Sequence, residues 1–262
     1  MAGSQQFAVV TGASSGIGLE LARQFVAHDF DVLIAAEDDE LAGLAGELST
    51  GGADVRAVRT DLSTAAGVEE LVSAITAAGR PVDAIAINAG VGNGGLFTEI
   101  PLADEQRLIA LNIGSTVHLA KRILPQMVSR GAGRVLFTAS VASTMPGPYY
   151  ATYAASKAFV LSFAEAVRYE LKDTGVSVTA LMPGPTDTGF FDRAGMNDAP
   201  VDSAAKDDPA DVARDGFEAL MAGKDHVVAG SAKNKLQLAG GKLMPDPVKA
   251  AVHARMTKPE SE

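Results

Sequence analysis

The sequence of 262 residues contains no cysteine, which excludes disulfides, thiol nucleophiles and thiolate metal sites. It also has no cluster of lysine and arginine, and its formal net charge is −10. We therefore expect no nucleic-acid partner, because binding to phosphates needs a basic surface. The four histidines (His28, His118, His226 and His253) lack the spacing of metal ligands, so we expect no metal site and interpret them as surface or packed residues.

Long apolar runs are absent as well. No segment has the length of a membrane span, and the first residues lack the basic flank and apolar core of a signal peptide. We therefore expect no membrane partner and a cytoplasmic location. Hydrophobic residues make up 47% of the sequence and charged residues 21%, which is typical of a globular protein. Without a repeat, a low-complexity run or a linker, residues 1–262 are expected to form a single domain.

Short apolar segments alternate along the chain with segments of helical apolar spacing. Strands are predicted at residues 7–10, 31–36, 55–58, 82–88, 134–138, 176–181 and 226–229. Helices are predicted at residues 19–26, 40–48, 65–78, 104–129, 153–172 and 209–221. This alternation predicts an α/β fold, a doubly wound parallel sheet of about seven strands with helices on both faces, as in a Rossmann fold. Ligands of such sheets lie at the carboxyl ends of the strands.

Three other segments have local features that predict their structure. Pro125 lies within the long helix at 104–129 and is expected to kink or end it. Residues 186–208 mix glycine, proline and acidic residues with isolated apolar ones, which predicts a loop with a short helix that can serve as a substrate lid. Residues 232–262 are interpreted as a weakly amphipathic C-terminal tail with a frayed polar end.

A glycine-rich turn connects the first strand to the first helix. Its sequence is Thr11-Gly12-Ala13-Ser14-Ser15-Gly16-Ile17-Gly18. Such a turn points backbone N–H groups and the positive end of a helix at an anion, and glycines let a pyrophosphate approach the chain closely. A glycine turn can also be purely structural. Three glycines between a buried strand and an amphipathic helix favour a nucleotide site, formed by Gly12, Ser14, Ser15, Gly16, Ile17 and Gly18.

Tyr153 and Lys157 are four positions apart at the start of a predicted helix, so both side chains can project into one pocket. A nearby cation favours the phenolate, so we expect Lys157 to lower the pKa of Tyr153 and make it a proton donor and acceptor. The same pairing is also common on helix surfaces.

These residues together resemble the short-chain dehydrogenases/reductases, and the resemblance covers nearly the whole chain. The matching features are the glycine turn, Asn88-Ala89-Gly90, Asn112, Ser140, Tyr153 with Lys157, and Pro183-Gly184. The resemblance implies an oxidoreductase that interconverts a secondary alcohol and a ketone or aldehyde, with a catalytic tetrad of Asn112, Ser140, Tyr153 and Lys157. Ile87 and Ser115 replace the asparagine and glycine that are common in the family, and neither change removes a catalytic group.

The resemblance also implies a role for each member of the tetrad. Tyr153 exchanges the proton of the substrate oxygen, and Ser140 binds that oxygen. Lys157 acts on Tyr153 and holds the nicotinamide ribose, while Asn112 keeps a water in place for proton exchange. Further cofactor contacts are implied for Asp61, Leu62, Asn88, Ala89, Gly90, Pro183, Gly184, Thr186 and Thr188.

The choice between NAD and NADP depends on the end of the second strand. Ala36 stands where NAD-dependent members of the family carry an acid, and Glu37, Asp38 and Asp39 follow it. These carboxylates would repel a 2′-phosphate, and the glycine turn has Ser15 where a basic residue could compensate. We therefore favour NAD, with Glu37 as a cofactor contact and NADP as the alternative. The acids can also be explained as a solvated helix start.

The substrate is expected to be a small molecule with a carbonyl or alcohol group. Its pocket is predicted to include Ser140, Val141, Ala142, Met145, Pro146, Tyr150, Tyr153, Pro185, Phe190 and Phe191, which suggests an apolar or medium-sized compound. The same side chains could instead pack a lid. The resemblance implies a homodimer or homotetramer. The main alternative function is a nucleotide-sensing or scaffolding protein without turnover, and a sugar-nucleotide epimerase or dehydratase is disfavoured by the glycine spacing and the short chain.

Overall fold

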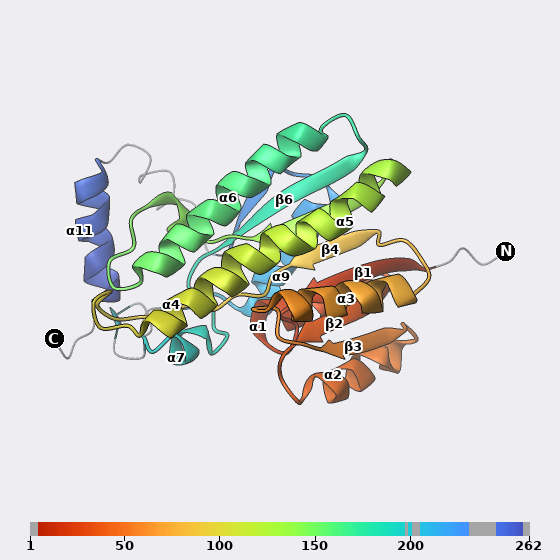
Figure 1. The fold of residues 1–262 in the computed structure, drawn as a ribbon, viewed down its shortest axis with the longest axis horizontal. Helices are drawn as coiled ribbons and strands as arrows, with labels where there is room; N and C mark the ends of the chain where they lie inside the picture. The colour runs from red at the N-terminus through yellow and green to blue at the C-terminus, as the bar shows by residue number, and fades with distance from the viewer. Residues whose placement is uncertain (1–4, 197–198, 201–204, 231–244, 259–262) are drawn as a thin grey trace.

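The computed structural model describes residues 5–196, 199–200, 205–230 and 245–258. Within these residues a seven-stranded sheet has the order β3-β2-β1-β4-β5-β6-β7, and all neighbouring strands are parallel. The strands are β1 (Gln6–Thr11), β2 (Phe30–Ala36), β3 (Val55–Arg59), β4 (Ala84–Ile87), β5 (Gly133–Thr138), β6 (Val176–Pro183) and β7 (His226–Ala229). This confirms the predicted doubly wound parallel sheet (Figure 1).

The central strands β1, β2 and β4 are buried on both faces. Successive residues of a strand point to opposite sides of the sheet, so each of these strands contributes to two apolar layers. In β1, Phe7 and Val9 join one apolar layer, and Ala8 and Val10 join the other. The first layer is covered by α3 (Ala65–Ala77), α5 (Thr116–Arg130) and α6 (Ala151–Leu171), as Figure 1 shows. The second is covered by α1 (Gly16–Ala27), α2 (Leu41–Leu48) and α9 (Pro209–Met221). Helices therefore cover both faces, as predicted.

The long helix predicted at 104–129 is interrupted, but not at its proline. It consists of α4 (Leu102–Ile109), a π-helical segment η2 (Ala110–Ser115) and α5. Pro125 lies inside α5, which continues to Arg130, so of the two predicted effects of Pro125, a kink or an end, the end is wrong. Ile123 and Met127 on either side of it are buried in the first apolar layer, and this packing outweighs the lost backbone hydrogen bond. The interruption is instead the wider π turn, which contains Asn112.

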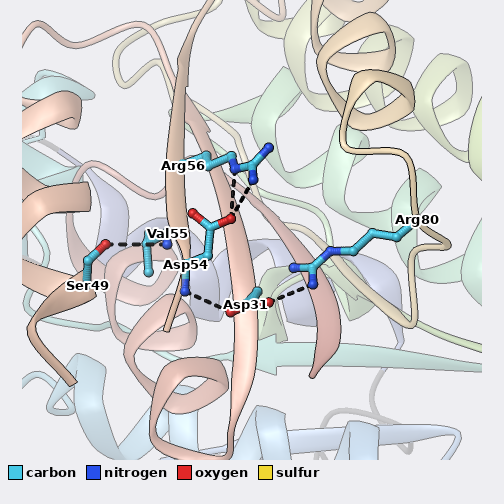
Figure 2. A network of polar contacts seen from close by, with 6 residues as sticks. All are labelled: Asp31, Ser49, Asp54, Val55, Arg56 and Arg80. Atoms are coloured by element: carbon cyan, nitrogen blue, oxygen red, sulfur yellow. Dashed lines mark hydrogen bonds and ion pairs between the residues drawn. The ribbon is translucent and has the colours of Figure 1, made fainter. Parts of the chain in front are cut away.

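A polar network holds the amino end of the sheet, at the start of β2 and just before β3 (Figure 2). The carboxylate of Asp31, on β2, accepts a hydrogen bond from the backbone N–H of Asp54 at 2.7 Å and pairs with Arg80 at 2.6 Å. Asp54 in turn binds Arg56 on β3. The guanidinium of Arg80 also lies 4.6 Å from the centre of the Phe7 ring. The connection from α3 to β4 is thereby tied to three strands.

The two segments after β6 that were predicted as lid and tail are only partly described. In the first, α7 (Phe190–Arg193) is the expected short helix, and a bridge between Thr186 and Asp207 joins the two ends of the segment. Residues 197–198 and 201–204 of the predicted lid lie outside the described residues. So do residues 232–244 and 259–262 of the predicted tail, whose polar end was expected to fray. The described part of the tail forms α11 (Asp246–Thr257). Among the helices of the described ranges, none combines the length and apolar character needed to cross a membrane.

Candidate active site

The glycines of the glycine turn stand where a larger side chain does not fit. Gly12 has φ +65°, a left-handed conformation that favours glycine. A Cβ atom on Gly18 would overlap the carbonyl oxygen of Gly12, so α1 can approach the end of β1 only with glycine there. Ser15 precedes α1 and makes no side-chain capping bond. The first N–H groups of α1 are therefore available to an anion.

Asn88 connects the carboxyl ends of three strands. Its side-chain Nδ2 donates to the carbonyl of Thr11 at 3.1 Å, and its Oδ1 accepts from the hydroxyl of Thr138 at 3.0 Å. The hydroxyl of Thr11 accepts from the backbone N–H groups of Asn88 and Ala89. These bonds set the spacing of β1, β4 and β5 where the glycine turn begins.

Asn112 lies beneath the site rather than in it. Its side chain pairs with the backbone of Val91, accepting from the N–H and donating to the carbonyl, both at 2.9 Å. Its Nδ2 also donates to the hydroxyl of Ser156 at 3.0 Å, and that hydroxyl donates to the carbonyl of Tyr153. Asn112 is 1% exposed. It therefore links the loop after β4 to the helix that carries Tyr153.

Ser140, Tyr153 and Lys157 converge beyond the end of β5. Ser140 caps the short 3₁₀ segment η3 (Val141–Thr144), and its hydroxyl accepts from the N–H of Ala142 at 3.1 Å. Lys157 is buried, and its Nζ donates to the carbonyl of Thr138 at 2.8 Å. The same Nζ lies 5.8 Å from the centre of the Tyr153 ring. The sequence prediction that Tyr153 and Lys157 share one pocket is confirmed by this geometry.

The predicted lowering of the Tyr153 pKa is wrong for the protein alone. Burial raises the pKa of Tyr153 to about 12, and a hydrogen bond with Ser140 opposes this only in part. Burial also lowers the pKa of Lys157 to about 8. Removal from water therefore outweighs the attraction between the two groups, because each loses hydration of its charged form. At neutral pH the site holds a protonated phenol beside a predominantly charged ammonium.

One continuous pocket brings most of the predicted site residues together. From the predicted cofactor set it is lined by Gly12, Ser14, Ser15, Gly16, Ile17, Gly18, Glu37, Asp61, Leu62, Asn88, Ala89, Gly90, Tyr153, Lys157, Pro183, Gly184, Thr186 and Thr188. From the predicted substrate set it is lined by Ser140, Val141, Ala142, Met145, Tyr150, Pro185, Phe190 and Phe191. Asn112 and Pro146 do not line it.

Two lining residues that sequence reasoning missed come from the C-terminal helix α11. His253 and Met256 both face the pocket, although more than ninety positions separate them from Tyr153. No spacing pattern connects a histidine in a weakly amphipathic segment with a pocket formed by other strands. His253 had been interpreted as a surface or packed residue, and it is indeed packed, with 4% of its surface exposed.

The acids after β2 are paired with arginines. Glu37 binds Arg107, on α4, at 2.6 Å, and the same guanidinium lies 3.6 Å from Asp61. Asp39 binds Arg59 at 2.6 Å. These groups are exposed, with 51% of the Glu37 side chain accessible, so solvent weakens the pairs. The two arginines therefore balance part of the negative charge of these carboxylates.

A sequence profile described as short chain dehydrogenase matches residues 6–198, which contain the glycine turn and the Ser140, Tyr153 and Lys157 cluster. The chain belongs to the short chain dehydrogenase family. Among curated relatives, this short chain dehydrogenase is 40% identical over 187 residues to a 1-deoxy-11-beta-hydroxypentalenate dehydrogenase of Streptomyces avermitilis, covering 69% of this chain and 68% of that protein.

Solved structures of the family agree with the fold. A short-chain dehydrogenase from Sphingobium yanoikuyae in complex with NADPH aligns with a TM-score of 0.81 at 27% identity, covering 90% of this chain and 93% of the other. A short chain dehydrogenase/reductase from Burkholderia phymatum in complex with NAD aligns with a TM-score of 0.79, also at 27% identity, covering 91% and 92%. The two relatives thus carry different nicotinamide cofactors.

Proposed function

We propose that this short chain dehydrogenase is an NAD(P)-dependent oxidoreductase that interconverts a secondary alcohol and a ketone or aldehyde. The observation that carries the proposal is that Ser140, Tyr153 and Lys157 converge and line the same pocket as the glycine turn. A proton donor, a cation and an anion-binding turn in one cleft are the groups that carbonyl reduction by a dinucleotide requires.

The residues of the pocket fit a nicotinamide dinucleotide. When bound, the cofactor supplies or accepts the hydride. The available N–H groups at the start of α1 would bind its pyrophosphate, and Asp61 with Leu62 would contact the adenine. At the other end, Lys157 would hold the nicotinamide ribose and Thr186 with Thr188 would bind the carboxamide.

Tyr153 acts as the general acid in the direction of reduction. Its raised pKa keeps the phenol protonated at neutral pH, so a proton is available to the substrate oxygen. The charged Lys157 stabilises the phenolate that remains, and the Ser140 hydroxyl binds the same substrate oxygen. Asn112 has a supporting role, because its bonds to Val91 hold the loop after β4 in place for the water-mediated proton exchange.

Replacing Tyr153 by Phe tests the function. We expect turnover to fall by at least about a hundredfold, because the proton donor is lost while the ring remains. A panel of ketones and alcohols followed by nicotinamide absorbance measures turnover, and calorimetry measures cofactor binding, which should be retained. An unchanged rate in Tyr153→Phe contradicts the proposed mechanism. A wild-type protein that binds the cofactor but turns over nothing in the panel supports the alternative of a nucleotide sensor or scaffold.

We propose NAD rather than NADP as the preferred cofactor. The Glu37 carboxylate at the ribose end of the pocket can accept hydrogen bonds from two ribose hydroxyls, whereas a 2′-phosphate would meet its charge. Arg107 balances part of that charge, which makes the preference moderate rather than absolute. Comparing kcat/KM for NADH and NADPH on one ketone tests this, with Glu37→Gln expected to lose the discrimination. A clear NADPH preference in the wild type overturns the proposal.

The arrangement of the chain around the site completes the proposal. Residues 1–262 form one catalytic domain, in which residues 186–208 act as a substrate lid. The lid is supported by Phe190 of α7, whose ring centre lies 5.2 Å from the ring centre of Tyr153.

A homodimer or homotetramer is supported by large apolar side chains exposed on α4, such as Leu102 and Ile109. Light scattering at several concentrations measures the assembly, and a monomer throughout contradicts it.

A further inference from the structure

The C-terminal helix α11 is attached to the loop that precedes the catalytic helix α6. The hydroxyl of Thr257 donates to the carbonyl of Pro148 at 2.8 Å. Nδ1 of His253 lies 2.8 Å from the carbonyl oxygen of Pro146. Both side chains are buried, with 1% and 4% of their surface exposed. The helix therefore holds this loop through two backbone carbonyls.

The contacts of His253 determine which ring nitrogen carries the proton. A carbonyl oxygen can only accept, so Nδ1 must donate to Pro146. In the neutral ring, Nε2 is then an acceptor, and it lies 2.5 Å from the hydroxyl of Tyr150. Burial lowers the pKa of His253 and raises the pKa of Tyr150, so both groups are neutral at pH 7. The hydroxyl of Tyr150 thus donates a hydrogen bond to Nε2 of His253.

The ring of Tyr150 lies against the ring of Tyr153. The two ring centres are 5.5 Å apart and their planes differ by 14°, while the His253 ring meets Tyr150 edge-on at 5.2 Å. Tyr149, the residue before, has φ 63°, which is costly for a residue with a side chain. A loop in this conformation needs contacts outside itself to keep Tyr150 in place. The N–H of Gly95 donates to the Tyr149 carbonyl at 2.8 Å, and α11 provides the contact to the Tyr150 side chain.

We propose that His253 is a positioning residue for the reaction: it holds the Tyr150 hydroxyl, and the stacked Tyr150 ring in turn fixes the orientation of Tyr153 in the pocket. The part of this inference that concerns turnover rests on the function proposed above. The part that concerns the orientation of Tyr153 does not, because it can be measured without cofactor or substrate.

The kinetic test uses two replacements that each keep one of the two hydrogen bonds. His253→Asn keeps a donor near Nδ1 for Pro146 but has nothing at the position of Nε2, whereas His253→Gln keeps an acceptor for Tyr150. We expect His253→Asn and Tyr150→Phe each to lower kcat about tenfold with little change in KM, because misplacement of the proton donor acts on the chemical step. His253→Gln should stay within about threefold of the wild type.

Two comparisons separate positioning from general loss of structure. The double variant His253→Asn/Tyr150→Phe should be no slower than Tyr150→Phe alone, because both changes break the same contact. Thr257→Val removes the other bond between α11 and the loop without touching Tyr150, so kcat should be unchanged. Additive losses in the double variant, or a kcat of His253→Asn equal to that of the wild type, overturn the proposal.

A spectroscopic test needs no turnover. The chain has four tyrosines, so a protein labelled with fluorotyrosine gives four ¹⁹F resonances that single Tyr→Phe variants assign. In His253→Asn the resonances of both Tyr150 and Tyr153 should shift or broaden, and in Thr257→Val the Tyr153 resonance should not. If only the Tyr150 resonance changes, His253 does not position Tyr153. Either outcome of the ¹⁹F experiment decides whether His253 orients Tyr153, even if the proposed oxidoreductase activity is not found.

Discussion

Replacing Lys157 by Met tests whether the buried ammonium group of Lys157 lowers the free energy of unfolding of this protein. Lys157 is 5% exposed, and burial lowers its pKa from 10.5 to about 8. The difference, 10.5 − 8 = 2.5 units, is worth roughly 3 kcal/mol at about 1.4 kcal/mol per unit. Loss of the 2.8 Å bond from Nζ to the Thr138 carbonyl costs about 2 kcal/mol, because that acceptor is left unpaired. We therefore expect Lys157→Met to raise the free energy of unfolding by about 1 kcal/mol at pH 7.

The pH dependence of this difference is a stricter test. Because the pKa of Lys157 is lower in the folded state than in the unfolded state, its cost is fully present below about pH 8 and disappears as the pH rises toward 10.5. The stability difference between Lys157→Met and the wild type should therefore fall by about 2 kcal/mol between pH 7 and pH 9.5, from an advantage of about 1 kcal/mol to a disadvantage of about 1 kcal/mol.

Urea denaturation followed by circular dichroism, with both proteins in the same buffers, measures this difference. Groups that titrate alike in the two proteins cancel in the comparison. Lys157→Arg is the matched control, because it keeps a buried cation that does not lose its proton, and it should be less stable than the wild type at both pH values. An advantage of Lys157→Met that stays constant or grows with pH refutes the reasoning.

Three further predictions concern residues at the two ends of the sheet. Gly18→Ala should abolish cofactor binding in calorimetry and lower the free energy of unfolding by about 2 kcal/mol, because its Cβ would overlap the Gly12 carbonyl oxygen. Ser140→Ala should lower kcat by about a hundredfold with cofactor binding intact, since one hydrogen bond to the developing charge is lost; an unchanged kcat would exclude the role given to Ser140. Arg80→Met should destabilise the protein in urea by about 2 kcal/mol without changing KM, because the carboxylate of Asp31 is 9% exposed and loses its cationic partner.

The fold was predictable because each of its elements has a local signal. Strand segments such as β2, which is buried on both faces, are short continuous apolar runs, and the helices between them have apolar residues at helical spacing. When strands and helices alternate, a doubly wound parallel sheet buries the apolar faces of both. The π turn at η2 was not predictable, because it depends on bonds from Asn112 to Val91 and Ser156 that form only when the sheet is assembled.

The pKa of Tyr153 was predicted in the wrong direction. The sequence places a phenol and an ammonium one helical turn apart, and their attraction is the only effect that spacing reveals. How far each group is removed from water depends on the residues packed around them, which come from several elements. In the structure this burial dominates, raising the pKa of Tyr153 and lowering that of Lys157.

The sequence by itself determined the chemistry that is available: a glycine turn for an anion, a tyrosine with a lysine one turn later, and a serine that follows a strand. These depend on contacts between near neighbours, so their spacing along the chain is enough. The tertiary structure alone decided what surrounds Tyr153, because His253 and Tyr150 are 103 positions apart and meet only when α11 packs against the loop. Contacts at such separations depend on how the surfaces of complete elements pack together. The local pattern of a weakly amphipathic segment does not predict that packing.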